Sequence, residues 1–234
     1  MLKQNYTEIY MEEHQNKKYR YERKFIIQYN FLTPFLSDVL SSRFTKSYSD
    51  RKVNNIYLDD YNFSSLNHNF DGLSKREKYR IRWYGDSFKL SKKTLEIKTK
   101  NEFLNTKDFF EVKPLQLKHM DKINHFYLNF KKELFKKNDM SKLLFLQNKR
   151  PTLFNSYKRM YFENNIKGVR LTIDKDLVFH SPITKINFAE RNIIVEIKYN
   201  KEISFTNQLK QLSFTRYSKY VKGTSQTNFS NTIY

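Results

Sequence analysis

Cysteine is absent from the 234-residue sequence, and glycine and proline occur only four times each. Without cysteine the chain forms no disulfide, no thiolate nucleophile and no cysteine-ligated zinc site, which fits a cytoplasmic protein. The scarcity of glycine and proline leaves no flexible interdomain linker. No apolar run reaches the roughly 18 residues of a transmembrane helix, and the N-terminal residues lack the apolar core of a secretory signal. We therefore expect no membrane insertion.

Acidic residues are few relative to basic ones. The chain has 44 Lys and Arg against 24 Asp and Glu, a net charge of +20. This excess is larger than solubility requires, so it indicates a polyanionic partner. Nucleic acid, an anionic membrane surface and a phosphorylated small molecule all qualify. The many aromatic side chains could stack on bases, but they alternate with the charged positions and are interpreted as a packing layer, so no nucleic-acid partner is expected.

The order of polar and apolar residues predicts one β-rich domain with a few helices. Alternating patterns predict strands near residues 19–28, 52–59, 75–84, 93–100, 156–163, 169–175 and 192–199. Between the strands, helices are expected at 32–43, 114–137 and 203–214. In the long segment at 114–137 the apolar residues follow three- and four-residue spacing. We place a single domain at 19–223, between a polar lead-in at 1–18 and a polar tail at 224–234.

Several predicted strands carry charge on one face only. Residues 75–86 read KREKYRIRWYGD, in which side chains alternate between the faces of a strand. The charged face of this strand holds Arg76, Lys78, Arg80 and Arg82. Taken alone, such a strand is more often the solvated face of an ordinary sheet. The same arrangement recurs, however, in RYERKF at 20–25, LEIKTK at 95–100 and VEIKYN at 195–200.

Cations that face one enclosed space repel one another unless an anion lies among them. Arginine matches phosphate oxygens through its two-pronged guanidinium, and lysine adds a mobile point charge. The interleaved glutamates cannot hold phosphate, but they can ligate a divalent metal that bridges phosphate oxygens. The pattern therefore predicts a phosphate-chain pocket. Asp59 and Asp60 are interpreted as a turn signal and not as metal ligands.

At these residues the sequence resembles the triphosphate tunnel metalloenzymes, and among them the catalytic domain of the vacuolar transporter chaperone (VTC) family of polyphosphate polymerases. The stretches that carry the likeness, in order, are RYERKF (20–25), NIYLDD (55–60), KYRIRWYG (78–85), LEIK (95–98), YKRMYF (157–162), VRLTID (169–174), VEIKY (195–199) and RYSKYVKG (216–223). The resemblance implies an α+β fold, an antiparallel β-barrel or triphosphate tunnel with helices packed outside. It also implies transfer of the γ-phosphoryl group of ATP to a growing polyphosphate chain.

The resemblance also assigns roles to individual residues. The catalytic phosphate ligands it implies are Lys24, Arg80, Arg82, Lys98, Arg159, Arg170 and Lys198. Further phosphate-binding residues are Arg20, Lys78, Arg216, Ser218 and Lys219. Glu196 is the implied ligand of Mn²⁺ or Mg²⁺, together with Glu22 and Glu96, although these two could instead position a Lys or Arg.

Other activities on the same scaffold stay open. A metal-dependent triphosphate hydrolase, a nucleotidyl cyclase and a non-catalytic polyphosphate-binding module use the same cations, and the sequence separates them poorly. Arg at position 20, where many relatives have Glu, favours the polymerase branch. The implied partners are ATP and polyphosphate. Eukaryotic relatives also carry a sensor domain and a membrane part that are not found in this sequence, so a membrane-protein partner could associate the protein with a membrane.

Overall fold

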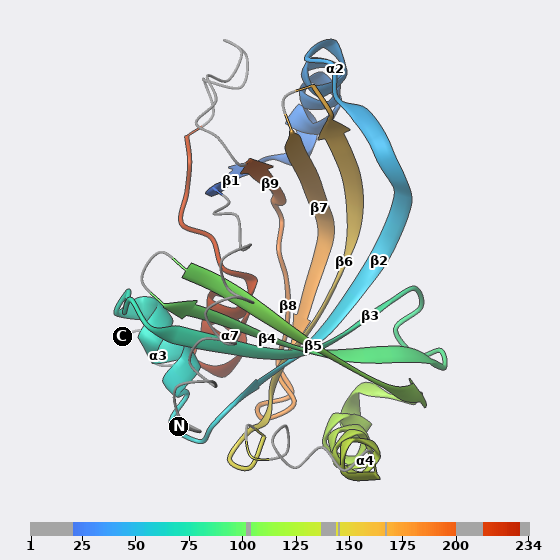
Figure 1. Ribbon diagram of the computed structural model, residues 1–234, viewed down its shortest axis with the longest axis vertical. Coiled ribbons are helices and arrows are strands. Elements are labelled where there is room, and N and C mark those ends of the chain that lie inside the picture. Colours follow the sequence, from blue (N-terminus) through green and yellow to red (C-terminus); the bar gives the residue numbers. More distant parts are fainter. Residues whose placement is uncertain are drawn as a thin grey trace, which may run out of the picture.

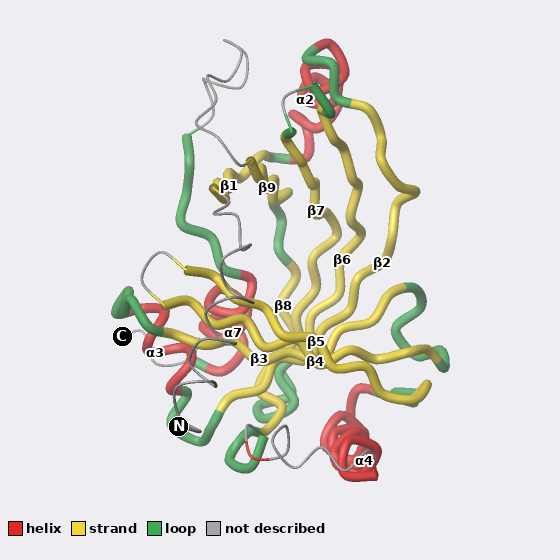
Figure 2. The backbone as a smooth tube through the Cα atoms, in the orientation of Figure 1, coloured by secondary structure: helices red, strands yellow, loops and turns green. Residues whose placement is uncertain are grey.

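The structure is a computed structural model that describes residues 21–101, 104–136, 144, 146–166, 168–199 and 213–229. Arg20 and nearly all of the helix predicted at 203–214 lie outside these residues. Figures 1 and 2 show a single strongly curved sheet with helices at its ends and faces. None of the helices in the described ranges combines the length and the apolar character that crossing a bilayer requires.

All strand pairs of the sheet are antiparallel, in the order β1-β9-β7-β6-β2-β3-β4-β5, with β8 paired to β7. The strand bounds are β1 Tyr21–Ile27, β2 Thr45–Asp59, β3 Arg76–Tyr84, β4 Ser91–Asn101, β5 Leu104–Leu115, β6 Arg150–Asn164, β7 Val169–His180, β8 Asn187–Ala189 and β9 Ile193–Tyr199. In Figure 1 the strands β7, β6 and β2 stand side by side, and β3, β4 and β5 run across below them. The sheet therefore encloses a concave face.

The closed barrel predicted from the sequence is not confirmed. Among the described residues β1 pairs only with β9 and β5 only with β4, so the sheet stays open. The C-terminal segment occupies the free edge of β1 instead, because the Thr215 amide donates a hydrogen bond to the Lys24 carbonyl at 2.8 Å. An ion pair crosses the open side of the sheet: Lys98 Nζ on β4, the strand next to the end strand β5, lies 3.7 Å from Glu22 Oε2 on the other end strand, β1.

Strand β5 replaces the first part of the helix predicted at 114–137. The helix α4 begins only at Ile123 and ends at Lys136, after a short 3-10 turn η2 at Met120–Lys122. Pro114 falls within β5, an edge strand of the sheet, where its missing amide hydrogen costs no ladder bond. A proline also turns the preceding residue away from helical geometry. The sequence analysis placed this proline at a helix start, and that was wrong.

Two helices cover the convex face of the sheet. The helix α4 buries Ile123, Phe126, Tyr127, Phe130 and Leu134 in a core that includes Trp83 and Ile81 of β3. The helix α2, Leu32–Ser41, follows the 3-10 turn η1 at Tyr29–Phe31 and packs on the outer side of β1, β6, β7 and β9. These two helices confirm the expected outer packing.

The helix α7, Lys219–Asn228, packs on the concave face instead. Its Tyr220 stacks on Tyr57 of β2, with ring centroids 5.1 Å apart, and lies in a core with Tyr157 and Ile194. The expectation that every helix lies outside the sheet was therefore wrong for α7. The predicted tail begins at residue 224, inside this helix, whose Thr224 and Thr227 are buried.

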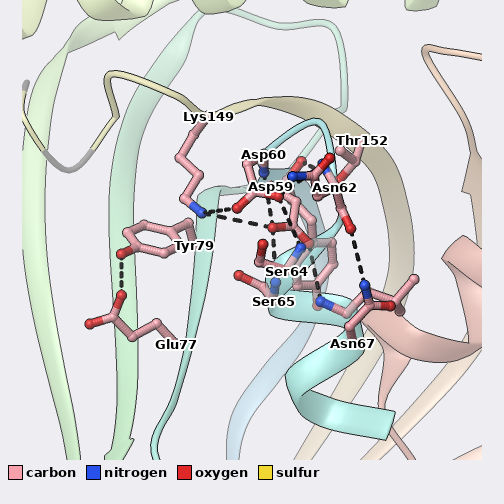
Figure 3. Close-up of polar contacts among 12 residues, drawn as sticks. Asp59, Asp60, Asn62, Ser64, Ser65, Asn67, Glu77, Tyr79, Lys149 and Thr152 are labelled. Carbon is pink, nitrogen blue, oxygen red and sulfur yellow. Dashed lines mark hydrogen bonds and ion pairs between the residues drawn. The ribbon is translucent and has the colours of Figure 1, made fainter. Parts of the chain in front are cut away.

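The turn after β2 contacts both α3 and α7 through hydrogen bonds of Asp59. Asp59 is fully buried and accepts hydrogen bonds from the amides of Ser65 and Leu66 at the start of α3, Ser64–Phe70, at 3.0 and 3.1 Å (Figure 3). Tyr220 of α7 donates to the same carboxylate at 2.5 Å. Asp60 accepts from the Ser64 amide at 2.9 Å. Both carboxylates therefore hold a helix start, in agreement with the turn interpretation.

We expect Gly223→Ala to destabilise the protein. A Cβ atom at this position would lie 2.7 Å from Leu153 Cδ2 and 2.8 Å from Phe179 Cε1, too close for either atom. Alanine in a helix normally stabilises it by about 1 kcal/mol relative to glycine. A loss of stability in this variant would therefore arise from the close packing of α7 and not from helix propensity. Overpacking of about 1–3 kcal/mol would lower Tm by several degrees. Gln226→Ala, on a less buried position of the same helix, is the control, and an unchanged Tm for Gly223→Ala would contradict this packing.

Candidate functional site

The concave face of the sheet gathers charged side chains from seven strands and the helix α7. Alternation on each strand turns the apolar residues toward α2 and α4 and the charged residues inward. The basic side chains on this face are Lys24, Lys78, Arg80, Arg82, Lys98, Lys107, Arg159, Lys198 and Lys219. The carboxylates among them are Glu22, Glu96, Asp174 and Glu196. Cations therefore outnumber acids, and three clusters form.

The first cluster surrounds Glu96 on β4. Arg80 donates to its Oε2 atom from Nε at 2.6 Å, and Arg80 Nη2 forms an ion pair with the same oxygen at 2.5 Å. Lys107 Nζ lies 3.2 Å from the same oxygen, and Arg82 Nη1 lies 3.6 Å from Oε1. Burial opposes the charge of Glu96, but Arg80, Arg82 and Lys107 outweigh it and lower its pKa to about 2. Glu96 therefore stays ionised and holds the arginines in place.

The second cluster pairs two carboxylates across β1 and β9. Glu22 Oε1 lies 2.7 Å from Lys24 Nζ, and Glu196 Oε1 lies 2.6 Å from Lys198 Nζ. Each lysine also lies within 4 Å of the other carboxylate, at 3.6 Å for Lys24 and Glu196 and 3.8 Å for Lys198 and Glu22. Burial opposes the ionisation of Glu196, yet Lys198 and Lys24 hold its pKa well below the usual range.

The third cluster surrounds Asp174 on β7, which is fully buried. Arg159 of β6 binds this carboxylate with two prongs, from Nε at 2.5 Å and from Nη2 at 2.7 Å. Lys219, at the start of α7, lies 2.6 Å from Oδ2 and also 4.9 Å from the ring centroid of Tyr157. This cluster fastens the C-terminal helix to the charged face.

A buried polar network joins the first and third clusters. Arg82 donates to Asn55 Oδ1 at 2.8 Å and to the Tyr157 hydroxyl at 3.3 Å. Asn55 in turn donates to Asn155 Oδ1 at 2.7 Å. Arg82 is only 7% exposed, so this network fixes its side chain where a solvated arginine would be mobile. The basic groups are thus held in position before any ligand arrives.

Lys78 of β3 differs from the other cations. Its Nζ donates to Ser218 Oγ at 3.2 Å, and Ser218 also caps the start of α7. No carboxylate lies within 4 Å of Lys78 in the described part of the chain. Burial, together with Lys24, Lys98 and Arg76, lowers the pKa of Lys78 to about 7. An incoming anion would favour its charged form, so binding would draw a proton.

The structure brings most of the sequence-predicted site residues into these clusters, but not all. Arg170 lies at the start of β7, exposed, opposite Lys198 in the strand register. Arg216 is exposed beside Gly72, and its charge lowers the pKa of Arg76, which burial already depresses. Both therefore lie at the rim of the charged face. Arg20 lies outside the described residues.

Sequence reasoning missed three members of the site. Lys107 was missed because β5 was not predicted, although the apolar positions Phe110 and Val112 alternate with polar ones around it. Asp174 closes the stretch VRLTID (169–174), in which the sequence analysis assigned a role to Arg170 alone. The aromatic side chains as a group were interpreted as a packing layer, yet the hydroxyl of Tyr157 accepts a hydrogen bond from Arg82. The aromatic residues are therefore not confined to the outer layer.

The pair Glu22 and Glu196 fits the divalent metal that the resemblance implies. Magnesium sites on phosphates commonly use one or two carboxylates, with substrate oxygens and water completing the octahedron. No three His, Cys, Asp or Glu side chains gather for a metal within the described residues, so the protein alone would supply an incomplete set. Glu96 fits less well, because two of the three cations beside it are the arginines Arg80 and Arg82, which cannot lose their charge. Among the described residues, the cations within 4 Å of Glu22 and Glu196 are all lysines.

We expect Lys78→Met to raise Tm in the absence of ligand. The native state disfavours the charged amine, whereas the unfolded chain keeps it charged up to the ordinary pKa of 10.5. Between about pH 7 and 10.5 the unfolded state therefore binds more protons than the native state, and the free energy of unfolding rises with pH in this range. Lys78 thus destabilises the native state most below pH 7 and least at high pH. The gain should be a few degrees at pH 6 and should shrink toward pH 10. Lys52→Met, at an exposed position, is the control, and an equal Tm for Lys78→Met and wild type at pH 6 would contradict this electrostatic cost.

Comparison with known proteins concerns the fold and the family of the chain. A candidate adenylate cyclase from Bacillus halodurans shares the fold, with a TM-score of 0.50 and 14% identity over 88% of this chain and 96% of that chain. Another candidate adenylate cyclase, from Vibrio parahaemolyticus, gives a TM-score of 0.46 and 9% identity over 87% of this chain and 96% of that chain. A candidate adenylyl cyclase from Hippeastrum, described with a dominant triphosphatase activity, gives a TM-score of 0.49 and 13% identity over 88% of this chain and 95% of that chain. No curated protein sequence matches the chain. The sequence profile of the VTC domain matches residues 19–228, and the chain therefore belongs to the VTC domain family, whose domain is of the triphosphate tunnel metalloenzyme type.

Proposed function

We propose that the protein is a polyphosphate polymerase, which transfers the γ-phosphoryl group of ATP to a growing polyphosphate chain. The observation that carries the proposal is the surplus of positioned cations on the concave face. Arg80, Arg82 and Arg159 are each held by a carboxylate or an amide, and lysines stand between them. Such a surface favours a chain of phosphates over a single phosphate, because charges repeat along it.

The reaction needs little covalent participation from the protein. The bond between the β,γ-bridging oxygen and the γ-phosphorus breaks, and a terminal oxygen of the polyphosphate forms a new bond to that phosphorus. ADP leaves with the bonding electrons. Catalysis then rests on alignment and on stabilisation of charge on the transferred group. Arg80, Arg82 and Lys107 would contact the phosphoryl oxygens, while Glu96 keeps the two arginines oriented.

A divalent ion, Mn²⁺ or Mg²⁺, would supply charge neutralisation between neighbouring phosphates. Glu22 and Glu196 would hold it, and Lys24 and Lys198 would turn from these carboxylates toward phosphate oxygens. The lysines lie within 4 Å of both acids, so short side-chain movements suffice. The proposed domain starts near residue 19, and its end lies beyond the predicted residue 223, since α7 continues to Asn228. A membrane-protein partner that would receive the product is also proposed.

The product of ATP turnover tests the proposal. We expect purified protein with ATP and Mn²⁺ to release ADP together with a ladder of polyphosphate on a gel. Free phosphate without polymer would identify a hydrolase instead, and pyrophosphate release a cyclase. Absence of turnover with retained tripolyphosphate binding would identify a binding module. Each of these three results would overturn the polymerase.

We expect Glu196→Gln to lower turnover by roughly 100-fold, a loss typical of removing one electrostatic contact from a preorganised site. The amide keeps the shape of the side chain but removes the charge that Lys24 and Lys198 neutralise. Melting temperature and steady-state ATP turnover should be measured across Mn²⁺ concentrations. Glu77→Gln on β3 is the matched control, because Glu77 lies on the opposite face of the strand and accepts a hydrogen bond from Tyr79. If Glu196→Gln turns over ATP as fast as the wild type at low Mn²⁺, Glu196 is not a metal ligand.

A further inference from the structure

Two tyrosines and an arginine form a separate group on the concave face. Tyr48 and Tyr161 meet edge to face, with ring centroids 5.6 Å apart. The Arg51 guanidinium lies over both rings, 5.0 Å from the centroid of Tyr48 and 5.8 Å from that of Tyr161. We call these three residues the aromatic shelf.

The aromatic shelf adjoins the phosphate-binding clusters directly. In the strand register Tyr48 lies opposite Tyr161, and Arg51 lies opposite Arg159. Arg159 is the residue that grips Asp174. Tyr161 is two positions from Arg159 on β6 and therefore shares its face. A ligand bound on the shelf would therefore lie next to Arg159, on the same face of the same strand.

The shelf lies at an open part of the sheet. The strand β3 pairs with β2 only from Val53 to Leu58, so the first half of β2, which carries Tyr48 and Arg51, has β6 alone as its partner. Tyr48 is 56% exposed. No carboxylate lies within 4 Å of Arg51 in the described residues, so its charge is balanced by aromatic faces only. An arginine held beside two aromatic rings, one of them largely exposed, is available to stack on another planar group.

The opposite rim of the charged face has a different character. There Arg76 and Arg216 approach each other near Gly72, and Lys78 lies on the same strand face as Arg76. No aromatic ring contact or cation–π contact involves these residues within the described chain. One rim therefore suits a planar ring and the other suits a bare chain of phosphates.

We propose that the aromatic shelf binds the nucleobase of a nucleoside triphosphate, with the triphosphate running from Arg159 toward Arg82 and Arg80. This inference rests on the proposed function, since it assumes that the clusters bind phosphates. Stacking on tyrosine and arginine tolerates any base but favours the larger purine rings. The nucleoside diphosphate would then leave on the shelf side, and the polymer would lie toward Arg76 and Arg216.

The test compares two ligands that share phosphates and differ in the base. Calorimetry would measure the affinity for the non-hydrolysable ATP analogue adenylyl imidodiphosphate and for inorganic tripolyphosphate, both with Mg²⁺. We expect Tyr48→Ala to weaken the nucleotide by roughly 10-fold, as the loss of one stack implies, and to leave tripolyphosphate unchanged. Tyr48→Phe, which keeps the ring, should bind both ligands as the wild type does.

Tyr61→Ala is the matched control, because Tyr61 is also exposed and also lies under an arginine, with Arg150 Cζ 4.3 Å from its centroid. It stands beyond the other end of β2, so nucleotide affinity should not change. The shelf assignment is overturned if Tyr48→Ala together with Tyr161→Leu leaves the ratio of the two affinities unchanged. An equal loss for both ligands would overturn it as well. If the wild type binds neither ligand, the proposed function itself fails, and that result is distinct from the other two.

Discussion

The structure depends on one electrostatic constraint: basic side chains that face each other across a concave sheet must be balanced. Glu96, Asp174 and the pair Glu22 and Glu196 supply that balance, and each is shared by at least two cations. Removing one partner of such a buried group leaves an uncompensated charge. The acids keep the cations close together while the ligand is absent.

The same constraint explains why the inward side of the sheet could be predicted. A period of two fixes which residues share a face, and the charged face of β3, β4 and β9 follows directly from KYRIRW, LEIK and VEIK. Periodicity gives no information on which strands become neighbours across the open side. The contact of Lys98 with Glu22 depends on how far the sheet curls, and curvature arises from bulges such as those in β2.

Two predictions differ from the structure because contacts with distant residues outweigh the local sequence pattern. The region around Pro114 has helical spacing in its apolar residues, but pairing with β4 decides its conformation up to Leu115. The polar sequence KGTSQTN after Tyr220 has the composition of a loose tail, yet its small side chains let α7 approach Leu153 and Phe179 closely. Helix formation there is a tertiary effect, since propensity alone would not place glycine and threonines in a helix.

The position of α7 has a consequence for synthesis. Contacts of Lys219 with Asp174, Thr215 with Lys24 and Tyr220 with Asp59 join the last described helix to strands made far earlier. A nascent chain on the ribosome carries the complete sheet before this helix emerges, with the edge of β1 and the self-repelling concave face both uncovered. Non-local pairing of this kind folds slowly and leaves unpaired edges open to aggregation.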